Sequence, residues 1–182
     1  MQLYLKAYEH MLNSFKGSEI NITHHEGVVK WIKELKPDAD ESFLIAGILH
    51  DIERAIHGDW KKGSIDPDVF KKHCQLSADE AERFLKQGEA DKDLIEKVKH
   101  LIINHEAGGD EDQDIINDAD ALSFFENNIP YFMKVKMKEV GKEVVEKKIQ
   151  NSWNRIKSDK AKKLAKPMYD DAINKLNKKD PL

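Results

Sequence analysis

Cysteine is almost absent from the chain, which has Cys74 as its single thiol among 182 residues. One cysteine cannot form a disulfide within the chain, and it excludes a zinc site made of several thiolates. So low a cysteine content is typical of proteins from a reducing compartment. Any metal site in this protein must therefore be built from histidine, aspartate and glutamate, which are plentiful.

Long hydrophobic runs are also lacking. No apolar run approaches the roughly 20 residues that a membrane-spanning helix needs. Residues 1–15 include Glu9 and His10 and lack the apolar segment of a signal peptide. Together with the low cysteine content, these absences predict a soluble, cytoplasmic protein with no membrane partner.

The net charge of −4 conceals an uneven distribution, because residues 134–180 hold 15 of the 30 basic residues but only 7 of the 34 acidic ones. A basic segment can bind nucleic acid or steer an anionic substrate. Here, however, arginine is represented only by Arg155, aromatic residues are few, and the lysines alternate with glutamates at helical spacing. A solvated helical face is therefore a better interpretation than a nucleic-acid-binding surface.

Proline and glycine are few, five and nine, and most of them separate segments with helical periodicity. No alternating pattern typical of strands persists. Helices are expected at about 3–15, 22–36, 40–55, 66–86, 92–106 and 113–127, followed by a helical stretch after Pro130 and a last helix, capped at Ser158–Asp159, that Pro167 bends or interrupts. The sequence thus predicts one all-α domain over 1–182, with a core at about 20–130 and a C-terminal helical extension at about 131–182.

Six side chains that can bind metal ions are spread over the expected helices: His24, His50, Asp51, His73, His105 and Asp120. His50 and Asp51 directly follow the apolar run 43–49. Burying an imidazole and a carboxylate behind such a run costs free energy unless a partner compensates. A divalent metal accepts neutral imidazole nitrogen and carboxylate oxygen together, so this pair indicates a metal site.

For His24 a competing interpretation exists. It lies on an apolar stripe with Val28 and Trp31, where a lone histidine is commonly a hydrogen-bonded core residue. Its neighbour His25 competes for the role of ligand. The helical register favours His24, because the apolar residues follow it at helical steps.

The remaining candidates also lie on inward-facing positions. His73 shares a helical row with the small residue Ser77, which allows a second helix to approach closely. His105 closes the apolar row of the expected helix 92–106. Asp120 stands among apolar residues and requires a cation or several donors. Asp118 is the alternative to Asp120, either solvated or acting behind the ligands.

In this order along the chain, the segments that carry these residues resemble the HD-domain superfamily of metal-dependent phosphohydrolases. The matching segments are His24-x-x-x-Val28, Leu49-His50-Asp51, His73-x-x-x-Ser77-Ala78-x-x-Ala81, Ile102-x-x-His105 and Asp118-Ala119-Asp120-Ala121-Leu122. The resemblance covers about residues 20–130. It implies an HD-domain-like helical bundle around a divalent metal site.

The resemblance also implies which residues bind metal. His24, His50, Asp51 and Asp120 would ligate one ion. Members that carry two further histidines often hold a second ion bridged by the aspartate of the doublet, and His73 and His105 match those positions. One or two ions are therefore expected, with iron, manganese, cobalt or nickel suited to the ligands and magnesium or zinc as further options.

The implied reaction is hydrolysis of a phosphate ester or anhydride in a phosphorylated small molecule, foremost a nucleotide, by metal-activated water. Asp51 would act at the metal, Glu53 or Asp118 would accept a proton, and Arg54 would bind phosphate. For Arg54, a surface salt bridge with Glu53 or Asp59 is the competing interpretation.

The sequence departs from the superfamily pattern in three places. Gly27 stands where a basic residue is common, Glu53-Arg54 replace the common Gly-Lys, and the polar stretch 57–66 is long enough to form a lid. Two other functions share the same ligand pattern: a diiron oxygenase of the inositol-oxygenase type, and a regulatory or binding module that retains metal without turnover. A homo-oligomer is compatible with all three functions.

Overall fold

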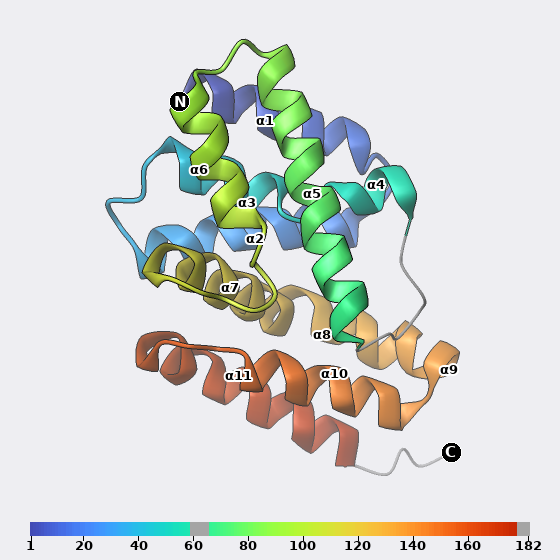
Figure 1. Ribbon diagram of the computed structural model, residues 1–182. Helices are drawn as coiled ribbons and strands as arrows, with labels where there is room; N and C mark the ends of the chain where they lie inside the picture. The colour runs from blue at the N-terminus through green and yellow to red at the C-terminus, as the bar shows by residue number, and fades with distance from the viewer. Residues whose placement is uncertain (59–65, 178–182) are drawn as a thin grey trace.

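The computed structural model describes residues 1–58 and 66–177, which form helices joined by turns (Figure 1). No strand occurs among these residues, so the all-α prediction is confirmed. The α-helices are α1 (Gln2–Ser14), α2 (Glu19–Leu35), α3 (Glu41–Leu49), α4 (Glu53–His57), α5 (Pro67–Gln87), α6 (Lys92–Ile102), α7 (Glu111–Ser123), α8 (Ile129–Tyr131), α9 (Met137–Val140), α10 (Lys142–Asn154) and α11 (Asp159–Asn177). Two π-helical segments, η1 (Phe124–Asn128) and η2 (Phe132–Lys136), flank α8.

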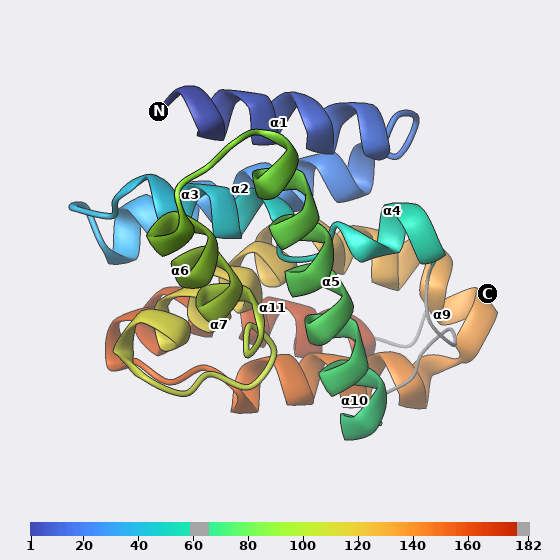
Figure 2. The ribbon, with the colours of Figure 1, turned by 45° about the horizontal axis from the view of Figure 1, so that its top comes forward.

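The helices are arranged around α3 and α2. Helix α3 packs against α1, α2 and α6, and every residue from Ser42 to Leu49 is buried. Helices α5 and α6 form a hairpin beside it, while α7 packs along α2 (Figure 2). Helices α10 and α11 pair with each other and lie on the far side of α7 from α3 (Figure 1). The most apolar segment of the sequence is thus the central helix, as its composition predicts.

The apolar core has two parts that meet at α7. Ile116 and Ala119 belong to a cluster formed with α1–α6, whereas Ala121 and Leu122 belong to a cluster formed with the segments that follow. Trp31 packs against both clusters. Since opposite faces of α7 are covered, polar residues on this helix are forced into the interior and need partners there.

Aspartate side chains begin four of the helices. Asp40, Asp66, Asp91 and Asp110 each accept a hydrogen bond from a backbone N–H of the first turn, over 2.8–2.9 Å. Such caps contribute about 1 kcal/mol each. The predicted start at Asp66, with Pro67 in the first helical position, is confirmed.

Helix ends differ from the expectation in several places. The helix expected at 40–55 is divided, because α3 ends at Leu49 and α4 begins at Glu53. The helix expected at 92–106 ends at Ile102. Gly141, with φ of +86°, divides the stretch after Pro130. Of the two effects expected at Pro167, a bend or an interruption, the interruption is wrong, since α11 continues through this residue.

Two further predictions from the sequence concern a lid and membrane-spanning helices. The lid expected at 57–66 falls mostly on residues 59–65, which lie outside the described residues. Within the described ranges, no helix combines the length and the hydropathy that a membrane crossing requires.

Candidate metal centre

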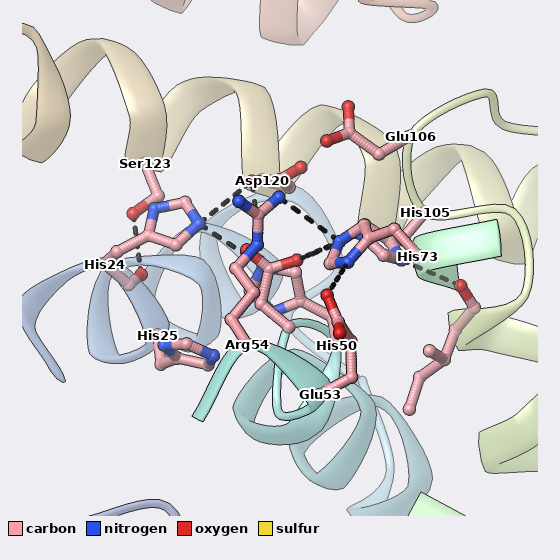
Figure 3. A network of polar contacts seen from close by, with 12 residues as sticks. His24, His25, His50, Glu53, Arg54, His73, His105, Glu106, Asp120 and Ser123 are labelled. Atoms are coloured by element: carbon pink, nitrogen blue, oxygen red, sulfur yellow. Dashed lines mark hydrogen bonds and ion pairs between the residues drawn. The ribbon is translucent and has the colours of Figure 1, made fainter. Parts of the chain in front are cut away.

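The six residues that the sequence predicts as ligands converge in one cluster, and each is at most 9% exposed. Figure 3 shows five of them, the four histidines and Asp120. His24, Asp51, His73 and Asp120 also line a cavity beside the cluster. They come from α2 (His24), the turn after α3 (His50 and Asp51), α5 (His73), the turn after α6 (His105) and α7 (Asp120). In three groups the potential ligand atoms all lie within 4.8 Å of one another: His24 with His50 and Asp120, Asp51 with His73 and His105, and His105 with Glu106 and Asp120. The first two groups together contain all six predicted ligands. The tertiary fold therefore joins residues that are up to 96 positions apart.

The first group is compact. Nε2 of His24 lies 3.1 Å from Oδ1 of Asp120 and 3.3 Å from Nε2 of His50. Nε2 of His50 lies 3.8 Å from the same oxygen of Asp120. Two imidazole nitrogens and one carboxylate oxygen thus face a common point.

The second group is centred on Asp51. Its Oδ1 lies 2.5 Å from Nε2 of His73 and 3.3 Å from Nε2 of His105. The same oxygen is 3.9 Å from Nε2 of His50, which belongs to the first group. Asp51 therefore lies between the two groups, as a carboxylate shared by two ions would.

Two of the imidazoles are oriented by backbone carbonyls. Nδ1 of His50 donates to the carbonyl of Gly47 over 3.0 Å, and Nδ1 of His105 donates to that of Ile102 over 2.9 Å. In a continuing helix those carbonyls would accept the N–H of the residue four positions on. The imidazoles take this place as the helices end, and their Nε2 atoms are left facing the cavity.

The division of the helix expected at 40–55 also explains how adjacent residues serve one site. Neighbouring residues of an α-helix point about 100° apart. Ile52 N–H bonds to the Leu49 carbonyl, and Arg54 N–H to the Asp51 carbonyl, which is the tighter spacing of a turn. This turn brings both His50 and Asp51 onto the cavity, which a regular helix would not do.

Glu53 lies behind His73. Its side chain is fully buried, and Oε1 accepts a hydrogen bond from Nδ1 of His73 over 2.6 Å (Figure 3). A carboxylate behind a metal-binding histidine fixes the tautomer and orientation of the ring. This contact suits an orienting role at His73, and the catalytic role expected of Glu53 stays a prediction.

Asp118 is not solvated. It is fully buried, and it accepts hydrogen bonds from the backbone N–H groups of Lys157 and Ser158 over 2.7 and 2.9 Å and from the Ser158 hydroxyl. Its oxygens therefore hold the turn before α11, and its role as a proton acceptor stays a prediction.

Arg54 lines the cavity and contacts one of the predicted ligands. Its Nε lies 2.8 Å from Oδ2 of Asp51, and its side chain is 26% exposed. Asp59, one partner considered from the sequence, lies outside the described residues. The guanidinium is therefore at the ligand cluster and in reach of a bound anion.

The geometry distinguishes His24 from His25. Both are buried, but Nδ1 of His25 bonds to the carbonyl of Asn21 over 2.7 Å, and its ring packs 4.8 Å from that of Phe15. Burial lowers the pKa of His25 to about 4. Figure 3 shows His25 outside the network of contacts, whereas His24 faces Asp120.

The cluster keeps its carboxylates ionised. Burial alone would raise the pKa of Asp51, but the charges of Arg54 and His73 hold that pKa well below its usual range. Burial opposes ionisation of Asp120 in the same way, and Arg155 together with His24 holds its pKa well below the usual range. For His50, burial lowers the pKa and favours the neutral form that binds metal.

These residues fit a divalent metal. Nε2 of His105 is buried and has no hydrogen-bond partner among the described residues, although it faces Asp51. Four imidazoles and two ionised carboxylates sharing one cavity would be costly without a cation. Mixed nitrogen and oxygen donors suit iron, manganese, cobalt, nickel or zinc better than magnesium, which prefers oxygen.

The cavity beside the ligands has a volume of about 240 Å³ and reaches into the C-terminal half of the fold. Its far wall carries the aromatic residues Phe124, Tyr131 and Phe132, from η1, α8 and η2, and the lysines Lys136 and Lys148. Nζ of Lys148 lies 5.1 and 5.6 Å from the ring centres of Phe70 and Phe124. The sequence analysis did not identify Lys136 and Lys148 as cavity residues, because both belong to the segment 134–180 that was interpreted as a solvated helical face.

A second network, also missed from the sequence, lies behind Asp120. Nη2 of Arg155 lies 2.6 Å from Oδ2 of Asp120, and its Nε lies 3.6 Å from Oε2 of Glu106. Glu106 also faces Nζ of Lys148 over 3.8 Å. One signal was present: Arg155 is the single arginine among the fifteen basic residues of 134–180.

The comparisons with known proteins identify a family without an assigned function. No curated protein and no solved structure matches the chain. The model of one family, described as a domain of unknown function (DUF4202), matches residues 9–178. The match includes α10 and α11, so the C-terminal helices are part of the family's domain. This chain belongs to the DUF4202 family.

Proposed function

We propose that this protein is a metal-dependent phosphohydrolase that cleaves a phosphate ester or anhydride in a small organic phosphate, foremost a nucleotide. One observation carries the proposal. The two groups of ligand atoms open into a cavity whose walls supply Arg54, Lys136 and Lys148 together with aromatic rings. Cationic groups beside a metal cluster favour an anionic, phosphorylated substrate.

In this proposal His24, His50 and Asp120 hold one ion, His73 and His105 hold a second, and Asp51 contributes to both. A bound divalent metal supplies a nucleophilic water at neutral pH and neutralises negative charge on a phosphoryl oxygen. Iron, manganese, cobalt or nickel would suit these ligands, and zinc is compatible with them.

The remaining residues bind and orient the substrate. Arg54, fixed through Nε by Asp51, carries further N–H groups that suit phosphate oxygens. Lys148 adds a positive charge at the opposite wall of the cavity, held over Phe70 and Phe124. The apolar and aromatic side chains would pack against the organic part of the substrate and limit the access of water.

The proposal is tested by measuring metal content and phosphate release together. Elemental analysis of the purified protein is expected to find one or two divalent ions per chain, and the variant Asp51→Ala is expected to lose most of them. With manganese, cobalt or nickel added, the wild-type protein should release phosphate from at least one compound in a panel of nucleotides and other phosphate esters.

The variant His100→Ala is the matched control, because His100 is exposed, with 52% of its side chain accessible, and pairs with Asp110 away from the cavity. It should retain both metal and turnover. A protein that binds metal yet hydrolyses no member of the panel would contradict the proposal, and oxygen uptake by the iron-loaded protein would point to an oxygenase instead.

A further inference from the structure

We propose that Arg155 is a positioning residue that holds Asp120 for metal binding, so that the C-terminal helices α10 and α11 complete the metal centre. The inference rests on the proposed metal site but not on the reaction proposed for it. Arg155 lies at the end of α10, and Asp120 lies on α7, 35 positions earlier in the chain.

The contacts of Arg155 reach two segments that carry ligands. Nη2 donates to Oδ2 of Asp120 over 2.6 Å. Nη1 donates to the backbone carbonyl of His105 and to Oδ1 of Asn117, each over 3.1 Å. One planar guanidinium thus fixes the distance between α7 and the turn that carries His105.

The contact with Arg155 leaves Oδ1 of Asp120, the oxygen that faces the two histidines, available for a metal ion. The guanidinium takes Oδ2, while Oδ1 faces Nε2 of His24 at 3.1 Å and Nε2 of His50 at 3.8 Å. A carboxylate held through one oxygen cannot rotate freely, so the other oxygen stays directed at the ion. Without this contact, Asp120 would turn between several orientations in its cavity.

Charge alone does not explain the arrangement. The network holds two cations, Arg155 and Lys148, against two carboxylates, Glu106 and Asp120. The four charges therefore balance, and the contribution of Arg155 to metal binding is geometric.

Arg155 is itself held firmly in place. Its backbone N–H bonds to the carbonyl of Asn151, and its neighbour Ile156 is buried. The next two residues, Lys157 and Ser158, are bound by Asp118 of α7. Two aspartates of α7 therefore bind the turn between α10 and α11. Asp118 accepts hydrogen bonds from the backbone of this turn, and Asp120 pairs with the guanidinium of Arg155.

The test is a titration of the metal-free protein with cobalt(II) alone, followed by visible absorption, which reports both affinity and ligand arrangement. The main variant is the double substitution Arg155→Met with Glu106→Gln, which removes one positive and one negative charge and so keeps the network neutral. We expect cobalt to bind at least about tenfold more weakly, with a changed spectrum. Lys163→Met, on the exposed face of α11, should match the wild-type protein.

Equal affinity and an unchanged spectrum in the folded double variant would overturn the inference. If circular dichroism shows that the double variant does not fold, the cobalt titration is repeated with Arg155→Lys, and its result decides whether the inference holds. Lysine retains the charge but not the planar fork, so weaker binding with a shifted spectrum is expected, and behaviour identical to the wild type would overturn the inference. Phosphate release is not read in this experiment, so a protein that binds cobalt without hydrolysing any phosphate contradicts only the proposed function.

Discussion

Glu53 accepts a hydrogen bond from Nδ1 of His73 over 2.6 Å at a position where its own side chain has no solvent exposure. This pair leaves Nε2 of His73 facing Asp51. We therefore predict that Glu53→Gln, which keeps the shape but removes the charge, weakens metal binding by about tenfold, in the range seen when partners behind a ligand are changed. Titration with manganese or cobalt measures the change.

The control for this prediction is Glu96→Gln, since Glu96 is an exposed residue of α6. It should bind metal as the wild-type protein does. A Glu53→Gln variant that folds and binds metal with unchanged affinity would show that the orientation of His73 does not depend on the carboxylate.

Lys148 provides a test of substrate binding at the wall of the cavity. Its side chain is 20% exposed and lies over Phe70 and Phe124. If it contacts the anionic substrate, Lys148→Met should raise KM by roughly tenfold or more, because a charge-assisted hydrogen bond contributes about 1.5–3 kcal/mol. Because Lys148 also pairs with Glu106 in the network behind Asp120, the metal content of the variant is measured beside KM.

Lys147 offers a matched control one position earlier in the same helix. Its side chain is 53% exposed and pairs with Glu143 at the surface. Lys147→Met removes the same charge from α10 without changing the cavity, so KM should stay near the wild-type value. Equal KM values for the two variants would show that Lys148 does not bind the substrate.

Local signals in the sequence were sufficient for most helices and for selecting the six side chains that the fold brings together. Asp66 before Pro67 predicts a helix start because both act within a single turn. The six side chains could be selected because imidazoles and carboxylates beside apolar runs need a partner, wherever that partner comes from. Such arguments need only the neighbouring residues of the chain.

What the sequence did not reveal depends on distant contacts. The apolar periodicity of 40–55 continues through His50 and Asp51, so nothing in the pattern indicates the turn that aims both at the cavity. Arg155 meets Asp120 only because α11 packs on α7. A lysine-rich helix looks solvated from its own composition, although one of its lysines, Lys148, lines the cavity.

The pKa of His25 predicts how stability depends on pH. Burial lowers that pKa from 6.5 to about 4, so the unfolded chain takes up a proton as the pH falls below about 6.5 while the folded protein does not. The contribution of this neutral histidine is present above pH 6.5 and is lost progressively down to about pH 4.

Urea unfolding of the metal-free protein at several pH values measures this loss. Between pH 6.5 and 4, the free energy of unfolding should fall less steeply with decreasing pH in His25→Phe than in the wild-type protein. The two slopes should differ by the equivalent of up to one proton taken up on unfolding. His50, whose pKa burial also lowers, still contributes in both proteins. Identical slopes would show that His25 takes up its proton equally in the folded and unfolded states.

Gly27 lies where α2 packs closely on α7 and the segment that follows it. A Cβ atom at this position would collide with Oγ of Ser123 and Nδ2 of Asn127. Ser123 in turn donates to the backbone carbonyl of His24 over 2.8 Å. A side chain here would therefore either break that buried hydrogen bond or push α2, which carries His24, away from Asp120.

We predict that Gly27→Ala destabilises the protein despite the better helix propensity of alanine. Overpacking costs about 1–3 kcal/mol, and alanine recovers at most about 1 kcal/mol. In a Ser123→Ala background the colliding hydroxyl is gone, so the same substitution should cost less, and a double-mutant cycle of urea unfolding measures the difference. If Gly27→Ala costs the same in both backgrounds, the hydroxyl of Ser123 does not set the spacing between α2 and α7, and the close approach must be maintained by Asn127 or by the backbone.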